Sequence, residues 1–256
     1  MTETVTSADG TVIAYDRQGD GPALIIVGGA LNTRQSPGEL LGLLASRFTV
    51  IAYDRRGRGD SGDTQPYAIE REVEDLAALI EAAGGSAFVY GHSSGAILAL
   101  EAASRGLPLS RVSAYEPPYT FDPDNPQPAS DGGVQATLDA GDRALAVTNF
   151  MRLTGMPQQA IDGVTQAPFW PGMLAIAHTL PYDLALSGDG AVPAHRLEAI
   201  AVPTLVMHGG ASPAWAARSA AAIVQAVPDA RQLAVAGQDH GVDPAVLAPL
   251  LIEFFA

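Results

Sequence analysis

The sequence predicts an α/β protein with a mainly parallel, doubly wound sheet, helices on both faces of that sheet, and one inserted helical segment. Two observations carry this prediction. Short runs of β-branched and apolar residues alternate with Ala- and Leu-rich stretches of helical length, and the alternation breaks only once, after Tyr115. The length of 256 residues and the 47% hydrophobic content suit one large domain with a sizeable core.

The expected elements follow in chain order, and both kinds have ordinary lengths. The strand candidates are Thr11–Asp16, Ala23–Val27, Phe48–Tyr53, Ala87–Tyr90, Val112–Tyr115, Thr204–Met207 and Gln232–Val235. The helix candidates are Gly38–Ser46, Ile69–Ala83, Ser94–Arg105, Ala214–Val227 and Pro244–Phe255. Several helix candidates lie between successive strands, which is the pattern of a parallel sheet with crossover helices.

The break after Tyr115 predicts an insertion. Five prolines fall within residues 117–128, and about sixty residues of helical periodicity without a convincing strand follow. We expect a helical cap at 120–197 on a core made of 1–119 and 198–256. An aromatic and thioether set in this cap either lines an apolar pocket or forms the cap's own core: Met151, Met156, Phe169, Trp170 and Met173.

Composition excludes several functions. The formal net charge is −14, and no basic cluster interleaved with aromatics is present, so nucleic acid is not an expected partner. The 14 basic residues are all Arg, which excludes Schiff-base chemistry and a phosphate-binding P-loop lysine, and Cys is absent. The first ten residues lack a signal-peptide pattern and no apolar run has membrane-spanning length, so we expect a cytoplasmic protein without a membrane partner.

The stretch AFVYGHSSG, residues 87–95, is the strongest functional motif. It places a Gly-x-Ser-x-Gly pentapeptide between an expected strand and an expected helix, so Ser93 falls on a sharp strand-to-helix turn. Gly91 and Gly95 suit such a turn because a Cβ atom at either position would collide across it. A plain glycine-rich turn is the alternative, but this context favours Ser93 as a nucleophile.

With three further segments, this motif resembles the α/β-hydrolase family over nearly the whole chain. The segments are IIVGGALN at 25–32, YDRRGRGDSGD at 53–63 and VAGQDHG at 235–241. The resemblance implies an eight-stranded α/β-hydrolase fold with a cap. In this family the segment containing Arg55, Arg56 and Arg58 is mainly a structural turn, and we read it so here.

The resemblance also implies an oxyanion hole and a general base. The backbone N–H groups of Ala30 and Ser94 would form the hole, and His240, after the last expected strand, is the expected base. The remaining histidines are weaker candidates for the base: His92, His178, His195 and His208. No two histidines have zinc-ligand spacing with a third ligand nearby, so we expect no metal and no cofactor.

The acid that orients the base is displaced. Most members of the family carry it after the seventh strand, where this chain has Ser212 within HGGASP. The chain is therefore a non-catalytic relative, a Ser–His dyad, or an enzyme whose acid follows another strand. Glu116 directly follows the expected strand Val112–Tyr115, the sixth in the family's numbering, and some relatives, including fungal resorcylic lactone hydrolases, use a Glu there. We favour Glu116 over Asp239 and Asp183.

The expected function is a serine esterase or lactonase with Ser93 as nucleophile, His240 as base and Glu116 as acid, acting on a small apolar ester or lactone with water as the only cosubstrate. Leu31, Trp170, His178 and Tyr182 are expected to contact the substrate. A Ser nucleophile disfavours the Asp-dependent enzymes of this fold. The alternatives are a ligand-binding, receptor-like relative and a C–C bond hydrolase, and we expect a monomer or homodimer.

Overall fold

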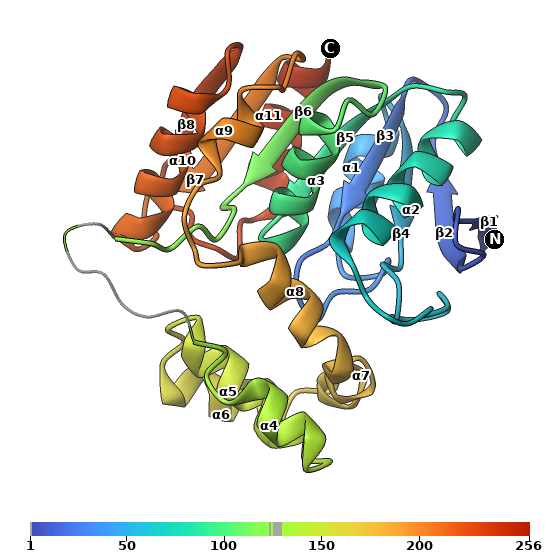
Figure 1. Cartoon of the computed structure of the whole chain (residues 1–256). Helices are drawn as coiled ribbons and strands as arrows, with labels where there is room; N and C mark the ends of the chain where they lie inside the picture. The colour runs from blue at the N-terminus through green and yellow to red at the C-terminus, as the bar shows by residue number, and fades with distance from the viewer. Residues whose placement is uncertain (1, 123, 125–129) are drawn as a thin grey trace.

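A computed structural model describes residues 2–122, 124 and 130–256, and its central feature is one eight-stranded sheet (Figure 1). The strand order is β1-β2-β4-β3-β5-β6-β7-β8. Strands β1 and β2 are antiparallel to their neighbours and the other six are parallel. The strands are β1 (Glu3–Thr6), β2 (Val12–Gln18), β3 (Ala23–Val27), β4 (Thr49–Tyr53), β5 (Ala87–His92), β6 (Leu109–Tyr115), β7 (Thr204–Gly209) and β8 (Ala230–Val235).

The burial of each strand follows its place in the sheet. Central strands such as β3, ALIIV, are continuous apolar runs because helices cover both of their faces. The edge strands β1 and β8 are mostly exposed. The mostly parallel eight-stranded sheet confirms the predicted fold class. The sequence pattern did not single out β1, whose four residues ETVT lack an apolar pattern and are held by pairing with β2.

Helices cover both faces of the sheet. On one face, α1 (Glu39–Ala45) and α11 (Pro244–Phe255) pack together, and their apolar side chains belong to one core cluster. The other face carries α2 (Ile69–Ala82), α3 (Ser94–Ser104) and α10 (Ala214–Ala226), which share a second cluster. No helix in the described residues combines the length and the apolar character needed to cross a bilayer.

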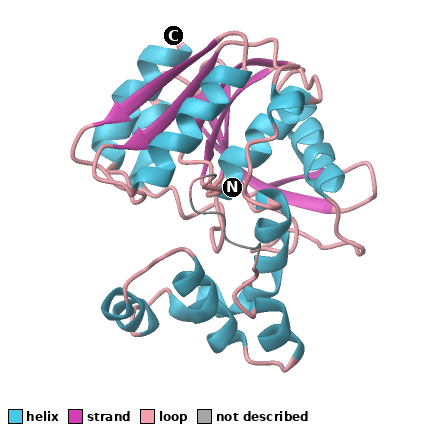
Figure 2. Cartoon of the chain, turned by 60° about the vertical axis from the view of Figure 1, so that its left-hand side comes forward, coloured by secondary structure: helices cyan, strands magenta, loops and turns pink. Residues whose placement is uncertain are grey.

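Among the described residues, six α-helices and one 3-10 helix lie between β6 and β7, and we call them the inserted helices. They are α4 (Val134–Asp139), α5 (Arg143–Leu153), α6 (Gln158–Thr165), α7 (Trp170–Ala175), η1 (Ala177–Thr179), α8 (Leu180–Ser187) and α9 (Ala194–Leu197). Helices α4 to α7 gather in a layer away from the sheet, and α8 returns towards it (Figures 1 and 2). Helix α8 packs on α3, and α9 packs on both α3 and α10. The segment that leaves β6 and the segment that returns towards β7 contact each other where Phe121 N–H donates to Gly190 O at 2.9 Å.

Candidate active site

Ser93 occupies the sharp turn between β5 and α3. Its φ of 58° and ψ of −126° are rare for a residue with a side chain, and such a conformation costs on the order of 1 to 3 kcal/mol. Backbone hydrogen bonds hold it. The Ser93 N–H donates to Tyr115 O at 2.9 Å, and Ser93 O accepts from Ala96 N–H at 2.9 Å. The side chain of Ser93 is therefore presented at the carboxyl edge of the sheet.

Three glycines make room for this turn. A Cβ on Gly91 would lie 2.3 Å from Gly95 O, and a Cβ on Gly95 would lie 2.2 Å from Val27 O. A Cβ on Gly29, in the loop after β3, would lie 2.9 Å from the Cβ of Ser93. All three contacts involve backbone or Cβ atoms that cannot swing away, so these positions require glycine.

Glu116 and His240 lie side by side. Glu116 follows β6 directly, its side chain is fully buried, and its Oε2 lies 2.7 Å from His240 Nδ1. The other carboxylate oxygen, Oε1, accepts from Gly209 N–H at 2.7 Å and from the hydroxyl of Ser212. Ser212, in the turn after β7, thus serves as a donor to the carboxylate.

The Glu116 carboxylate is held in its charged form. Burial alone raises its pKa, but hydrogen bonds from His240, Ser212 and Gly209 N–H outweigh burial and lower the pKa below its ordinary 4.5. The backbone is also constrained, because Glu116 has a φ of 48° and its N–H donates to Met207 O at 2.9 Å. Strand β7 therefore fixes both the main chain and the side chain of Glu116.

His240 is half exposed, with 47% of its side chain accessible. Its carbonyl oxygen accepts a 2.8 Å hydrogen bond from His92 Nε2, and the two rings lie 4.8 Å apart. Among the described residues, no hydrogen bond joins Ser93 Oγ to His240 Nε2. Such contacts are often long before substrate binds.

His92 supports the loop of His240 through its hydrogen bond to the His240 carbonyl. Its ring stacks on Tyr115 with centroids 5.7 Å apart, and Tyr115 in turn donates to Asp239 O at 2.6 Å. Burial, with the nearby His240, lowers the pKa of His92 to about 4. His92 is therefore a neutral ring that braces the main chain at residues 239 and 240.

Two free N–H groups flank Ser93. In the described part of the chain, neither Ala30 N–H nor Ser94 N–H donates to another protein group. Ser94 is the first residue of α3, where N–H groups have no partner within the helix and the dipole favours negative charge. The two groups are available to a ligand oxygen, and their role as an oxyanion hole stays a prediction.

A buried ionic network lies beside these N–H groups, and sequence reasoning missed it. Arg55 pairs with Glu72 at 2.6 Å and with Asp183 of α8 at 2.8 Å. Arg58 also pairs with Asp183, at 2.8 Å, and Ser94 Oγ donates to Asp183 at 2.7 Å. Burial raises the pKa of Asp183, but the two guanidinium groups and the Ser94 hydroxyl outweigh it, so the net pKa is below its ordinary value. In the sequence, the run of arginines is visible as a possible charged cluster, but nothing marks the distant Asp183 as its partner.

The four residues predicted to contact the substrate have different surroundings in the structure. Leu31 and Trp170 both pack against the apolar cluster of the inserted helices. His178, in η1, has a buried Nδ1 for which the described residues offer no hydrogen-bond partner. Tyr182 turns elsewhere: its hydroxyl donates to Asp63 at 2.8 Å and its ring stacks on Tyr67 at 4.0 Å. Phe169 is 59% exposed, and Met151 is buried in the cluster.

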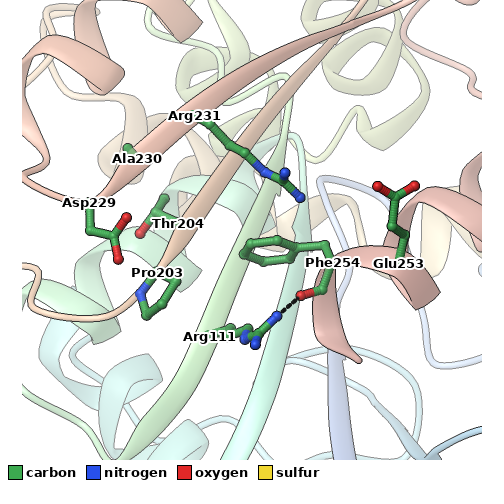
Figure 3. A pocket seen from close by; sticks show the side chains of 8 residues that line it. All are labelled: Arg111, Pro203, Thr204, Asp229, Ala230, Arg231, Glu253 and Phe254. Atoms are coloured by element: carbon green, nitrogen blue, oxygen red, sulfur yellow. Dashed lines mark hydrogen bonds between the residues drawn. The ribbon is translucent and has the colours of Figure 1, made fainter.

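Two cavities differ in their relation to this site. One of about 240 Å³ has His92, His240, Gly28 and Asn32 in its wall, with apolar side chains from α1 and α11. The other, of about 430 Å³, lies at the opposite edge of the sheet, where Arg111 and Arg231 flank the ring of Phe254 (Figure 3). Only the smaller cavity includes a residue of the Glu116–His240 pair.

The donor set does not suggest a metal centre. Within residues 2–122, 124 and 130–256, no group of three or more His, Asp or Glu side chains is placed to hold a metal ion. The chemistry available at the site is that of a hydroxyl, an imidazole, a carboxylate and two backbone donors.

Comparisons with known proteins agree on the family. The model of the Alpha/beta hydrolase family matches residues 23–250. The crystal structure of an alpha/beta hydrolase from Sphaerobacter thermophilus DSM 20745 is 52% identical, with a TM-score of 0.94 over 99% of this chain and 100% of that chain. An esterase from Rhodococcus sp. ECU1013 is 19% identical with a TM-score of 0.68, covering 99% of this chain and 98% of that chain. An enol-lactonase from Burkholderia xenovorans LB400 is also 19% identical, with a TM-score of 0.72 and 99% of both chains covered.

Proposed function

Since the chain belongs to the alpha/beta hydrolase family, we propose that it is a serine hydrolase that cleaves a small apolar carboxylic ester or lactone. The observation that carries this proposal is the 2.7 Å contact between Glu116 Oε2 and His240 Nδ1. It supplies an acid for the base although Ser212 replaces the carboxylate usual in relatives.

In the proposed reaction, Ser93 Oγ attacks the carbonyl carbon while His240 Nε2 accepts the hydroxyl proton. The carbonyl oxygen becomes an oxyanion that accepts from the N–H groups of Ala30 and Ser94. The bond from acyl carbon to leaving oxygen then breaks, and His240 returns the proton to the departing alkoxide. Water, deprotonated by His240, then attacks the acyl carbon, and the bond from this carbon to Ser93 Oγ breaks. The carboxylic acid product leaves, and His240 returns the proton to Ser93.

Glu116 suits the role of acid for two reasons. With Nδ1–H donating to the carboxylate, His240 has the tautomer that leaves Nε2 free to accept a proton. The hydrogen bonds from Gly209 N–H and Ser212 keep the carboxylate ionised, so it stabilises the imidazolium formed during each proton transfer.

The substrate class rests on the apolar surroundings and on the relatives. Leu31 and Trp170 pack against the same apolar cluster as Ala30, and such apolar side chains suit an apolar substrate. An esterase and an enol-lactonase share this fold. His178, with its unpartnered Nδ1, is a candidate polar contact. Tyr182 contacts Asp63 and Tyr67, and its predicted contact with substrate stays a prediction.

The test is labelling by a fluorophosphonate together with turnover of p-nitrophenyl butyrate. The adduct is expected on Ser93 by mass spectrometry, and Ser93→Ala is expected to abolish both labelling and turnover while the thermal melt is retained. An adduct on Ser94, or full turnover by Ser93→Ala, would contradict the assignment.

One observation favours a second candidate, a ligand-binding relative without turnover: Ser93 Oγ and His240 share no hydrogen bond in the described chain. The same assay separates the two. Saturable binding of short esters without any product release would support the second candidate.

A further inference from the structure

Arg58 lies behind the loop that carries Ala30. Its side chain is 1% exposed, and its Nη1 donates to Gly29 O at 2.6 Å. The carbonyl of Gly29 and the N–H of Ala30 belong to one peptide group, and in a planar trans peptide these two bonds point in opposite directions. A guanidinium that holds the carbonyl therefore also fixes the direction of the Ala30 N–H.

This peptide needs an external support. Gly29 is glycine because a Cβ would collide with Ser93, and a peptide next to glycine has access to backbone conformations closed to other residues. The only other hydrogen bond to Gly29 O in the described residues comes from Asn32 N–H, at a longer 3.3 Å. The Arg58 contact is the shorter of the two, and it is charge-assisted.

Helix α8 holds Arg58 in turn. Arg58 Nη2 donates to both carboxylate oxygens of Asp183, at 2.9 and 2.8 Å, and the same carboxylate accepts from Ser94 Oγ at 2.7 Å. The Asp183 carboxylate is thus connected to both N–H groups. It accepts from the side chain of Ser94, whose own N–H is one of them, and it holds Arg58, which binds the peptide of the other, Ala30.

We propose that Arg58 is a positioning residue that orients the Gly29–Ala30 peptide for the oxyanion, with Asp183 of α8 holding Arg58 in place. The inference rests on the proposed function, because the oxyanion hole matters only to a reaction that forms an oxyanion. It gives Arg58 a role in transition-state binding beyond that of a structural turn.

Two further features support this role. In the described part of the chain, Arg58 Nε is buried without a hydrogen-bond partner, an arrangement that packing alone does not favour. A cation on the carbonyl side of a peptide also polarises it, which strengthens the N–H on the other side as a donor. The guanidinium therefore both aims and strengthens the Ala30 N–H.

The test compares Arg58→Met with Arg56→Met. Arg56 is buried in the same turn and pairs with Asp75 and Asp9, but its described contacts do not include the loop after β3. With p-nitrophenyl butyrate, Arg58→Met is expected to lower kcat and kcat/KM together by about 10- to 100-fold, since an interaction made in the transition state is lost. The affinity for an alkyl trifluoromethyl ketone, whose adduct carries an oxyanion, should fall in the same proportion.

Arg56→Met is expected to lower the thermal midpoint but to keep kcat within about threefold. Equal kinetic losses in both variants, or an Arg58→Met enzyme with unchanged ketone affinity, would overturn the inference. If Arg58→Met does not fold, Arg58→Lys replaces it. The shorter ammonium is expected to keep the ion pair with Asp183 and to lose Gly29 O, with the same kinetic pattern.

A crystal structure of the variant separates this inference from the proposed function. The Gly29–Ala30 peptide is expected to rotate or to take two orientations, and an unchanged peptide overturns the inference. A wild-type protein that neither hydrolyses esters nor binds the ketone contradicts the proposed function, and the peptide orientation then decides the inference by itself.

Discussion

Glu116 is the residue whose replacement tests the displaced acid most directly. Glu116→Gln is expected to keep the fold and to lower kcat by about 10³ to 10⁴, because the amide favours the wrong tautomer of His240 and leaves the imidazolium unstabilised. The measurement is steady-state turnover of p-nitrophenyl butyrate. Adding Ser212→Asp to this variant should restore part of the rate, since Ser212, in the turn after β7, already contacts the Glu116 carboxylate.

A Glu116→Gln variant within about threefold of wild type would rule out Glu116 as the acid, because threefold is only ~0.65 kcal/mol of transition-state stabilisation. The site would then be a Ser–His dyad without an acid, or Asp239 would orient His240.

His92 gives a pH prediction. Its pKa of about 4 in the folded chain lies below the ordinary 6.5, so between these values the unfolded state binds more protons than the folded state. His92 therefore contributes stability that is fully present above about pH 6.5 and is lost as the pH falls towards 4. The imidazole resonances of His92 should remain those of a neutral ring at about pH 5.5 in NMR spectra. Titration near 6.5 would contradict the buried, neutral assignment.

At this scale, local patterns in the sequence predict some contacts and miss others. The position of Ser93 on a strand-to-helix turn was predictable because the strand, the glycines and the helix lie next to it in the chain. The contact between Glu116 and His240 follows from strand order: Glu116 follows β6 and His240 follows β8, and these two parallel strands flank β7, so both end at the same edge of the sheet. The pairing of Arg58 with Asp183 was not predictable, because 125 residues separate them and charged residues in turns are usually solvated.

The turn from β5 to α3 has no room for an added methyl group. Gly95→Ala is expected to destabilise the protein by about 2 to 3 kcal/mol, since the new Cβ would lie 2.2 Å from Val27 O and neither backbone can retreat freely. Urea unfolding, with the midpoint and slope compared with wild type, measures the change.

Gly172→Ala in α7 is the matched control, because a Cβ there meets nothing within 4 Å. It is expected to stabilise by about 0.5 to 1 kcal/mol, the advantage of Ala over Gly inside a helix. Equal effects of the two substitutions would show that steric room at the turn is not what requires glycine.

The elements themselves were largely predictable from periodicity. Helices α2, α3, α10 and α11 begin at the expected residues and end within one residue of expectation, because apolar spacing and flanking Gly or Pro define them. The packing of α9 on the core helices α3 and α10 was not, because a four-residue helix carries too little periodicity to show which layer it joins.

The whole molecule carries a net charge of −14 with half as many basic as acidic residues, so repulsion between surface charges dominates. Raising NaCl from about 10 mM to about 150 mM shortens the screening length from about 30 Å to about 8 Å. The thermal midpoint is expected to rise by something on the order of 2 to 4 °C. A midpoint that falls with salt would mean that attractive surface pairs outweigh the repulsion.

The chain leaves the sheet after β6 and returns in β7, and these two strands are paired neighbours, with Tyr115 opposite Met207. Because both ends of the insertion start from one place, closing a longer or shorter segment changes the entropy of the loop only slightly. Evolution can therefore exchange helices α4 to α7 for others while the sheet register stays intact, provided that α8 keeps Asp183 in contact with Ser94 and Arg58. The insertion is in this sense a modular part of the fold.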